Sequence, residues 1–303
     1  MSLTIQPTAA TLGATLTGVN LAALDAATWR EIEAAFHEYA VLIFPQQNLS
    51  AQAQLALATR FGEIEVLVEG LQTVPISNKA EDGKLFEENS HRMQLLRGNE
   101  GWHTDSSYMP LSAKASVLSA HVVPSAGGQT EWADARAAYA ALDAATKTRI
   151  ANLAAYHSYF YSQAKLGHEV AVGAGYGFFA GEPPLRPLVK VHPVTARPAL
   201  YIGRHAGKID GLDQDAADDL LEELMSFICQ PPRTLTHTWR AGDVAVWDNR
   251  CLLHRARPYD YREERVMMHT RIKGEVATET ATNYRSAPAA TSSAIAAQEN
   301  SAA

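Results

Sequence analysis

Histidine and acidic residues at two distant places in the chain have the types and spacing of metal ligands. His103 and Asp105 lie two positions apart in the run WHTD at 102–105. If this run is a β-strand, side chains two positions apart point to the same side, so both would reach one point. His254 ends the run WDNRCLLH at 247–254, just after an expected strand, and would be a third ligand. Two histidines and one carboxylate on one face of a metal form the ligand set of non-haem Fe(II) oxygenases and leave the other positions open.

Each of these residues also has a simpler interpretation. The chain contains 11 histidines, so about half a His-x-Asp match is expected by chance. His103 could be a core or surface histidine that pairs with its neighbour, and His254 a lone histidine near the end of a strand. The short motif alone leaves these alternatives open.

Arg265 and Thr130 could bind a carboxylate beside such a metal. Arg265 follows His254 by eleven positions, so one strand would carry the histidine and the next an inward guanidinium. A guanidinium binds a carboxylate through two parallel hydrogen bonds, which suits the distal carboxylate of a dicarboxylate whose 2-oxo acid end chelates the metal. Thr130, in GGQT at 127–130, could add a hydroxyl donor. Alternatively, Arg265 is a solvated residue in the charged run 262–265.

Taken together, WHTD, GGQT, WDNRCLLH and Arg265 resemble the Fe(II)/2-oxoglutarate-dependent dioxygenases of the taurine dioxygenase and 2,4-D dioxygenase family. The similarity covers about residues 3–276. Further stretches resemble the aryloxypropanoate (dichlorprop-type) branch: GNEGWHTDSSYMP, DARAAYAAL, SQAKLGH, PLRPLVKVHP and IGRHA. The resemblance implies a mostly β fold with helical decoration (α+β) and a double-stranded β-helix (jelly-roll) core of the clavaminate synthase-like kind.

The resemblance also implies a role for individual residues. His103, Asp105 and His254 match the iron ligands. Arg265 matches the arginine that binds 2-oxoglutarate, and Thr130 matches the threonine beside it. Trp247 matches a tryptophan next to the site; a core aromatic is an equally acceptable interpretation of it.

The substrate pocket is where the chain departs from the family pattern. Members that bind sulfonates or 2,4-D place another arginine four positions after the 2-oxoglutarate arginine, but here that position is His269, followed by Arg271. On a strand at 265–272, Arg265, His269 and Arg271 would share the inward face. Arg204, in IGRHA, is the predicted anchor of the substrate carboxylate, although it could be a surface arginine in a turn. Weaker candidates, each with the alternative of a solvated charge, are Arg97, Lys84 and Lys165.

The implied cofactors are Fe(II), 2-oxoglutarate as co-substrate, and O₂. The predicted substrate is a small carboxylate, with an aryloxypropanoate as the leading hypothesis. Hydroxylation next to its ether oxygen would release a phenol and a 2-oxo acid, with succinate and CO₂ from 2-oxoglutarate. A sulfonate or other small-anion dioxygenase is the alternative within the family. A metal-dependent hydrolase or isomerase on a cupin-like barrel would not need Arg265, and a non-enzymatic binding module would need none of the three ligands.

Short expected strands separated by turns must position these residues. They are 40–44, 116–123, 129–132, 156–161, 200–202, 234–239, 243–247 and 266–272. We expect helices over 29–39, from an N-cap at Ser50 to Arg60, and over 135–153 and 213–229; 78–92 reads as a surface loop. Many short strands with few crossover helices favour a sandwich or barrel over a doubly wound sheet.

Composition limits the remaining possibilities. The 303 residues are 47% hydrophobic and 19% charged, as in a globular protein, and their length would allow two domains. The ligands are 254 − 103 = 151 positions apart, which instead favours one jelly-roll domain over 1–276. We expect 277–303, rich in Ala, Thr and Ser, to be a flexible tail.

Charge and cysteine content bear on partners and location. A net charge of −7 argues against nucleic acid as the main partner. No apolar run approaches the ~20 residues of a membrane span, and the start of the chain lacks the pattern of a signal peptide. Only two cysteines occur, Cys229 and Cys251, which fits a reducing cytoplasm. We expect a cytoplasmic homo-oligomer that acts on a small anionic molecule.

Overall fold

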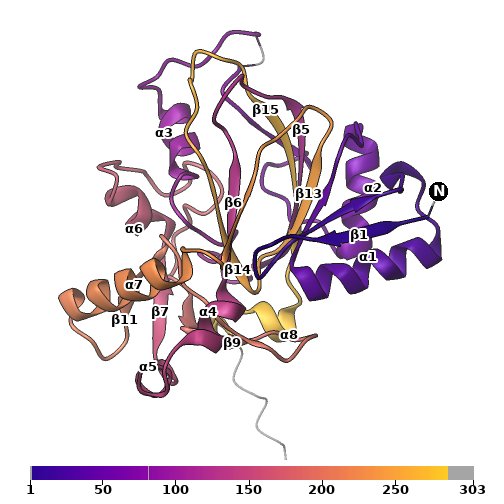
Figure 1. Ribbon diagram of the computed structural model, residues 1–303. Helices are drawn as coiled ribbons and strands as arrows, with labels where there is room; N and C mark the ends of the chain where they lie inside the picture. Colours follow the sequence, from indigo (N-terminus) through magenta and orange to yellow (C-terminus); the bar gives the residue numbers. More distant parts are fainter. Residues whose placement is uncertain (1, 81, 286–303) are drawn as a thin grey trace, which may run out of the picture.

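The computed structural model describes residues 2–80 and 82–285, and two β-sheets that face one another form its centre (Figure 1). The pairing within them is antiparallel except between β2 and β3. The large sheet has the order β1 (Thr4–Pro7), β2 (Ala14–Thr17), β3 (Val41–Phe44), β13 (Val244–Asp248), β5 (Ala113–Val122), β15 (Val266–Lys273), β4 (Val74–Ser77). The facing sheet has the order β12 (Thr234–His237), β6 (Thr130–Asp134), β14 (Leu252–Ala256). These two sheets are the expected jelly-roll core.

Successive side chains of the central strands point to opposite faces of the large sheet, and both faces are apolar. Leu118 and Trp247 point inward, where Trp247 meets Trp132 of the facing sheet with ring centroids 5.9 Å apart. Their neighbours Val117 and Val246 point outward into a second apolar cluster. Because successive side chains of a strand point to opposite faces, adjacent apolar residues indicate a strand buried on both sides.

Helices α1 (Ala26–Tyr39) and α2 (Ala51–Phe61) cover the outer face of the large sheet (Figure 1). Asp25 and Ser50 cap their first turns by accepting hydrogen bonds from backbone N–H groups. Phe36 and Phe61 pack with ring centroids 4.9 Å apart, joining the two helices over the sheet. The long α7 (Gln214–Ile228) lies beside β11 (Ala206–Ile209) at the other end of the molecule.

Shorter elements complete the description. The β11 strand belongs to a sheet with β7 (Ala154–His157) and β8 (Leu185–Pro187), and β9 (Val189–Val191) pairs with β10 (Pro198–Leu200). The remaining helices are α3 (His91–Gly98), α4 (Ala135–Ala141), α5 (Ala144–Ile150), α6 (Tyr159–Ala164), α8 (Val276–Glu279) and two 3₁₀ turns, Leu21–Ala23 and Thr282–Tyr284.

Two of the predicted elements are wrong in detail because a capping side chain interrupts them. The expected helix 135–153 is two helices, since the carboxylate of Asp143 accepts from the N–H of Thr146 and starts α5. The expected strand 156–161 changes at Ser158, whose hydroxyl accepts from the N–H of Tyr161 and starts α6. Asp and Ser favour such N-caps over continuation of the preceding element.

Residues 277–285, which the sequence analysis assigned to a flexible tail, are packed against the core. They complete α8 and form the last 3₁₀ turn, and the side chains of Glu279 and Ala281 are buried. The packed part of the chain therefore extends beyond the predicted boundary at 276. The rest of that predicted tail, 286–303, lies outside the described residues.

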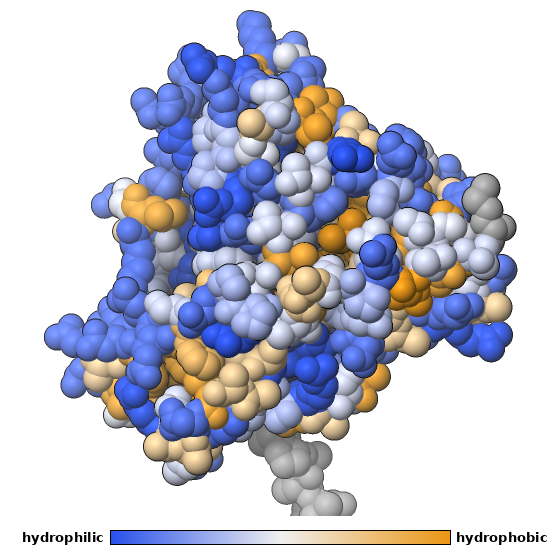
Figure 2. Space-filling view, in the orientation of Figure 1, coloured by the Kyte–Doolittle hydropathy of each residue, from blue (hydrophilic) through white to orange (hydrophobic). Residues whose placement is uncertain are grey.

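Hydrophilic residues predominate on the face seen in Figure 2, and hydrophobic residues gather there in separate patches. Large exposed hydrophobic side chains include Val66, Val68 and Val172. Within the described part of the chain, no helix combines the length and the apolar character required to cross a bilayer.

Candidate active site

The three predicted metal ligands meet in a cavity of about 710 Å³ between the two sheets. Donor atoms of His103, Asp105 and His254 all lie within 4.8 Å of one another, and all three side chains are buried. The backbones of the two histidines bind each other directly. His103 N donates to His254 O at 3.0 Å, and His254 N donates to His103 O at 2.8 Å. This pairing brings together segments that are 151 positions apart.

The local geometry differs from the strand that was expected at 102–105. His103 belongs to an isolated bridge, and Asp105 opens a turn that continues through Ser106 at φ 51°. His254 lies inside β14 rather than after a strand. The strand periodicity was therefore the wrong reason for the convergence. A tight turn, with a left-handed residue directly after the carboxylate, brings Asp105 back towards the histidines.

The protonation of the cluster suits metal binding. The Nδ1 of His103 donates to the carbonyl of Gly101 at 2.8 Å, which leaves Nε2 with a lone pair. Burial lowers the pKa of His103 to about 3 and that of His254 to about 4. Burial raises the pKa of Asp105, but Arg271 and the neighbouring histidines outweigh it and hold that pKa well below its usual range. Two neutral imidazoles and one carboxylate fit Fe(II).

Hydrogen bonds to both oxygens fix the carboxylate of Asp105. Ser116 donates to Oδ2 at 2.6 Å, and the guanidinium of Arg271 donates to Oδ1 at 2.6 Å. Asn249 donates to the Ser116 hydroxyl at 2.9 Å and accepts from the indole N–H of Trp247 at 3.0 Å. Trp247 therefore lines the cavity and also orients the metal carboxylate through Asn249 and Ser116.

Arg265 is a buried cation in the wall of the same cavity. Its guanidinium donates to the carbonyl of Gly128 at 3.3 Å and forms no ion pair within the described residues. Burial is the main cause that lowers the pKa of Arg265. Gly128 has φ 66°, and a Cβ there would lie 3.2 Å from Arg265 Nε, so glycine provides room for the arginine. Thr130 also lines the cavity, and its hydroxyl accepts from Trp239 at 2.9 Å.

The three residues predicted to bind the substrate lie in two places. His269 and Arg271 line the cavity with the metal ligands. His269 Nε2 is buried, has no hydrogen-bond partner among the described residues, and lies 3.7 Å from Asp105 Oδ2. Arg204 instead lines a separate cavity, where its guanidinium donates to the carbonyl of Ser162 at 3.4 Å. The structure therefore does not bring Arg204 together with the other two.

Several residues in or next to the cavity carried no clear signal in the sequence. An aromatic wall is formed by Tyr108, Tyr159 and Phe178, whose rings stack in succession with centroids 4.6 Å apart. Glu65 is a buried carboxylate whose Oε2 accepts from Ser106 at 2.9 Å. Burial is the main cause that raises the pKa of Glu65. These residues come from separate loops and from the start of α6, so no spacing rule connects them.

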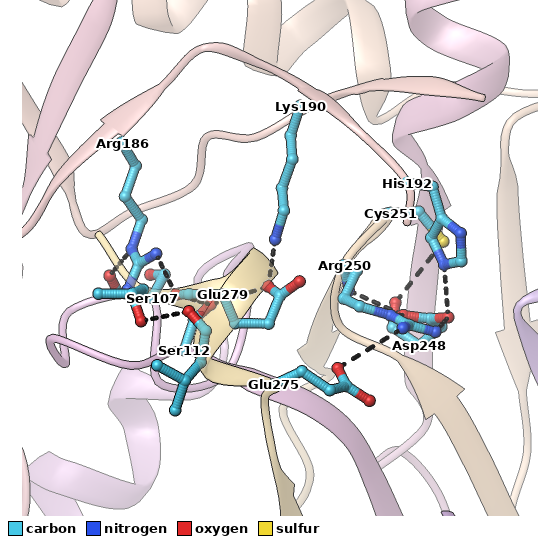
Figure 3. Close-up of polar contacts among 12 residues, drawn as sticks. Ser107, Ser112, Arg186, Lys190, His192, Asp248, Arg250, Cys251, Glu275 and Glu279 are labelled. Atoms are coloured by element: carbon cyan, nitrogen blue, oxygen red, sulfur yellow. Dashed lines mark hydrogen bonds and ion pairs between the residues drawn. The ribbon is translucent and has the colours of Figure 1, made fainter. Parts of the chain in front are cut away.

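Buried ion pairs and hydrogen bonds join neighbouring strands and turns (Figure 3). Arg250 donates to Asp248 at 2.8 and 2.7 Å, and His192 donates to the same carboxylate at 3.0 Å. Arg186 holds the loop after Asp105, because its Nε donates to the carbonyl of Ser107 at 2.6 Å.

A second group of His37, His192 and Asp248 also has the composition of a metal site. The N–H groups of Val194 and Thr195 both point at His192 Nδ1. His192 therefore carries its proton on Nε2, which faces Asp248, so no lone pair is directed at the centre of the group. This cluster has the geometry of a hydrogen-bonded support rather than of a metal site.

The jelly-roll core and the His103, Asp105 and His254 group are those expected of a non-haem iron dioxygenase, and the comparison with known proteins supports this class. Residues 4–271 match the family described as "Taurine catabolism dioxygenase TauD, TfdA family". The chain belongs to this family. It is a 2-oxoglutarate-dependent dioxygenase, and Fe(II), 2-oxoglutarate and O₂ are its cofactors and co-substrates.

Individual relatives indicate that the chain is similar to the aryloxypropanoate branch of the family. An "(S)-phenoxypropionate/alpha-ketoglutarate-dioxygenase" of Sphingobium herbicidovorans is 51% identical over 283 residues, which are 91% of this chain and 97% of the relative. A 2,4-dichlorophenoxyacetate dioxygenase of a Burkholderia species is 34% identical, over 83% of this chain and 88% of the relative. The crystal structure of AAD-2 with Mn(II) and N-oxalylglycine is 37% identical. It covers 90% of this chain and 98% of its own, with a TM-score of 0.84.

Proposed function

We propose that this enzyme hydroxylates an aryloxyalkanoate, in particular an aryloxypropanoate, and so cleaves it to a phenol and a 2-oxo acid. The observation that carries the proposal is the composition of one cavity. It combines the His103, Asp105 and His254 group with an aromatic wall and with Arg265, a cation that forms no ion pair within the described residues. An aryl ring prefers stacked or edge-on contact with such a wall. The activity for which the Sphingobium relative is named supports the same substrate class.

We assign His103, Asp105 and His254 to Fe(II), and Arg265 and Thr130 to 2-oxoglutarate. Arg265 would bind the distal carboxylate, since a buried guanidinium without an acidic partner gains most from an anion. The Thr130 hydroxyl, which already accepts from Trp239, has its proton available for the same carboxylate. Trp247 would limit the space beside the 2-oxoglutarate and hold Asn249 in place.

We propose that His269 binds the substrate carboxylate and that Arg271 contributes a positive charge beside it. The buried Nε2 of His269 faces the cavity without a partner in the described structure, and a buried polar group of this kind favours a ligand that supplies one. Arg271 already donates to Asp105, so its contribution would be mainly electrostatic. Arg204 stays a predicted anchor, because its present contacts lie in the neighbouring cavity.

When bound, Fe(II) with 2-oxoglutarate and O₂ supplies the oxidising chemistry that replaces a C–H hydrogen by a hydroxyl group. The residues of this chain bind and orient the reactants and exclude water. Each turnover would convert 2-oxoglutarate and O₂ to succinate, CO₂ and one inserted oxygen atom. A hydroxyl on the carbon next to the ether oxygen forms a hemiketal, whose C–O bond breaks as the hydroxyl proton moves to the leaving phenolate oxygen.

A substrate panel tests this function. Succinate and phenol should form in equal amounts from aryloxypropanoates when Fe(II), 2-oxoglutarate and O₂ are present. Taurine and alkyl sulfonates should give little succinate. Strong succinate release with sulfonates and none with aryloxypropanoates would contradict the proposed substrate class while leaving the dioxygenase class intact.

We further propose that the enzyme acts in the cytoplasm as a homo-oligomer, with no nucleic-acid or membrane partner. The acidic net charge of −7 and the two cysteines support this location and choice of partner. Light scattering of the purified protein would test the oligomeric state.

A further inference from the structure

We propose that Glu65 is a positioning residue for the metal carboxylate, and that Tyr176 connects it to a glycine-rich loop in the cavity wall. The proposal rests on the proposed metal site, so its test includes a control for that site. Neither residue is a proposed metal or 2-oxoglutarate ligand. Tyr176 lines the cavity that contains Asp105, and Glu65 lines a neighbouring cavity that Tyr176 also lines.

The backbone places Glu65 directly beside Arg271. Glu65 N donates to the carbonyl of Arg271 at 2.9 Å, and its neighbour Ile64 pairs with Ile272 of β15. The Glu65 side chain is 8% exposed. Its carboxylate is therefore a buried charge held next to a buried guanidinium, a position that requires compensating contacts.

Hydrogen bonds through Ser106 and Arg271 connect Glu65 to the carboxylate of Asp105. Ser106 Oγ donates to Glu65 Oε2 at 2.9 Å and accepts from Arg271 Nη1 at 2.9 Å. Arg271 Nη2 then donates to Asp105 Oδ1 at 2.6 Å. Arg271 Nε lies 3.9 Å from Glu65 Oε2 and has no hydrogen-bond partner among the described residues. Arg271 is thus held between two carboxylates, and Glu65 sets its distance from Asp105.

The turn at Ser106 also depends on hydrogen bonds to Glu65 and Arg271. Ser106 follows Asp105 directly and has φ 51°, a left-handed conformation that is unfavourable for a residue other than glycine. Its hydroxyl bonds to Glu65 and Arg271 hold this conformation. Loss of the Glu65 charge would therefore loosen both the turn that presents Asp105 and the arginine that orients it.

Tyr176 connects Glu65, Ser106 and Arg271 to the cavity wall. Its hydroxyl donates to Glu65 Oε1 and lies 3.3 Å from Ser106 Oγ, while the Arg271 guanidinium lies 5.9 Å from its ring centre. The tyrosine stands in the segment GAGYG at 173–177, whose three glycines all have positive φ. Glycines adopt many conformations, so the bond to Glu65 helps to hold this segment in the cavity wall, together with its backbone bonds such as that from Gly173 N to Phe178 O.

The chain contains a matched control pair. Tyr261 also donates to a glutamate, Glu100, but neither residue lines the cavity with the metal ligands. The test compares Glu65→Gln, Ser106→Ala and Tyr176→Phe with Glu100→Gln and Tyr261→Phe. Two quantities are measured: Mn(II) affinity by calorimetry in the presence of N-oxalylglycine, and the ratio of phenol to succinate during turnover.

We expect Glu65→Gln and Ser106→Ala to weaken Mn(II) binding about tenfold, as outer-shell partners of ligands do. Tyr176→Phe should keep the Mn(II) affinity but lower the phenol-to-succinate ratio at least about twofold, because a loosened wall holds the substrate less well. The control pair should match the wild type in both measurements. Ser106→Ala preserves all charges, so it remains informative if Glu65→Gln fails to fold.

Wild-type Mn(II) affinity in both Glu65→Gln and Ser106→Ala would overturn the positioning role. A wild-type ratio in Tyr176→Phe would overturn the connection to the loop. A His103→Ala variant distinguishes these failures from failure of the proposed site. If it binds Mn(II) as well as the wild type, the metal assignment itself is wrong.

Discussion

At the residue scale, Arg265 is a positive charge that no carboxylate of the described residues offsets. We expect Arg265→Ala to raise the KM for 2-oxoglutarate about 10- to 100-fold, because hydrogen bonds to charged groups contribute about 1.5–3 kcal/mol. The KM for the aryloxypropanoate should change much less. Steady-state succinate release measures both. Arg257→Ala is the control, since that side chain is 44% exposed; equal effects of the two variants would argue against a role for Arg265 in binding.

His269 allows a second test at this scale. Because its buried Nε2 faces the cavity, His269→Ala should raise the KM for aryloxypropanoate about tenfold, the loss of one hydrogen bond to an anion. The 2-oxoglutarate KM should be preserved. The same two KM values are measured for Arg204→Ala. A large effect of Arg204→Ala with none from His269→Ala would move the anchor to the neighbouring cavity.

His157 links stability to pH. Both ring nitrogens are buried without partners in the described structure, and burial, reinforced by Arg186, lowers its pKa from 6.5 to about 3. Below about pH 6.5 the unfolded chain therefore binds a proton that the folded chain does not. The free energy of unfolding should fall as the pH decreases, by up to about 1.4 kcal/mol per pH unit from this residue.

Urea unfolding of the metal-free protein between pH 7 and pH 5 measures this dependence. His157→Phe should make the slope shallower by the share of His157, while His103 and His254, whose pKa values burial also lowers, maintain the rest. The exposed His121→Phe should keep the wild-type slope. An unchanged slope in His157→Phe would assign the pH dependence to other groups.

His103 and Asp105 could be predicted as a candidate pair from the sequence because one short motif carries both, and His254 and Arg265 were added from other stretches. Spacing accounts only for the nearness of His103 and Asp105, whereas the approach of His254 depends on its long-range backbone pairing with His103. Glu65 and Tyr176 are 111 positions apart and meet only through two loops. Asn249 stood inside a recognised motif, yet its bond to Ser116 depends on how two strands pair.

At the element scale, α8 is held by a buried network that the composition of the C-terminal region did not indicate. Lys190 of β9 donates to Glu279, and Ser112 donates to the same carboxylate at 3.1 Å (Figure 3). Glu279 is fully buried. The region read as a tail because few large apolar residues remain there. A few buried charges hold it instead, and a hydrophobicity pattern cannot reveal them.

We expect Glu279→Ala to lower the free energy of unfolding by about 3–5 kcal/mol, because it leaves Lys190 buried without its partner. Urea unfolding measures the loss. Adding Lys190→Met should recover much of it, since replacing both charges removes the unpaired ion. Glu275→Ala is the control, because Glu275 is 49% exposed in its pair with Lys114 and should cost less than about 1 kcal/mol. Similar losses in the two single variants would contradict this account.

The strand pattern of the core was the most predictable part of the fold. Runs such as 244–247 are apolar on both faces because both sheet faces are covered, and turns bound them clearly. The 3-residue strands β8, β9 and β10 are too short for any periodicity, and they pair only because the intervening chain folds back.

At the scale of the whole molecule, the metal site joins β14 of the facing sheet to the loop at 102–105, whose Asp105 also accepts a hydrogen bond from Ser116 of β5 in the large sheet. Binding Mn(II) with N-oxalylglycine should therefore stabilise the entire fold. At 100 times the dissociation constant the free energy of unfolding rises by about 2.7 kcal/mol, and thermal unfolding should shift upward. A chelator should reverse the shift, and His254→Ala should not show it. A shift that persists in His254→Ala would place the metal elsewhere.

The mutual backbone pairing of His103 and His254 has a consequence for synthesis. Because 254 − 103 = 151 residues separate them, a ribosome adding about 5–20 residues per second makes the second histidine about 8–30 s after the first. During that interval the nascent chain holds a histidine and a carboxylate but lacks the partner strand that closes the cluster. Iron acquisition therefore follows translation of nearly the whole chain, and a product interrupted before residue 254 cannot compete for the metal as a folded site.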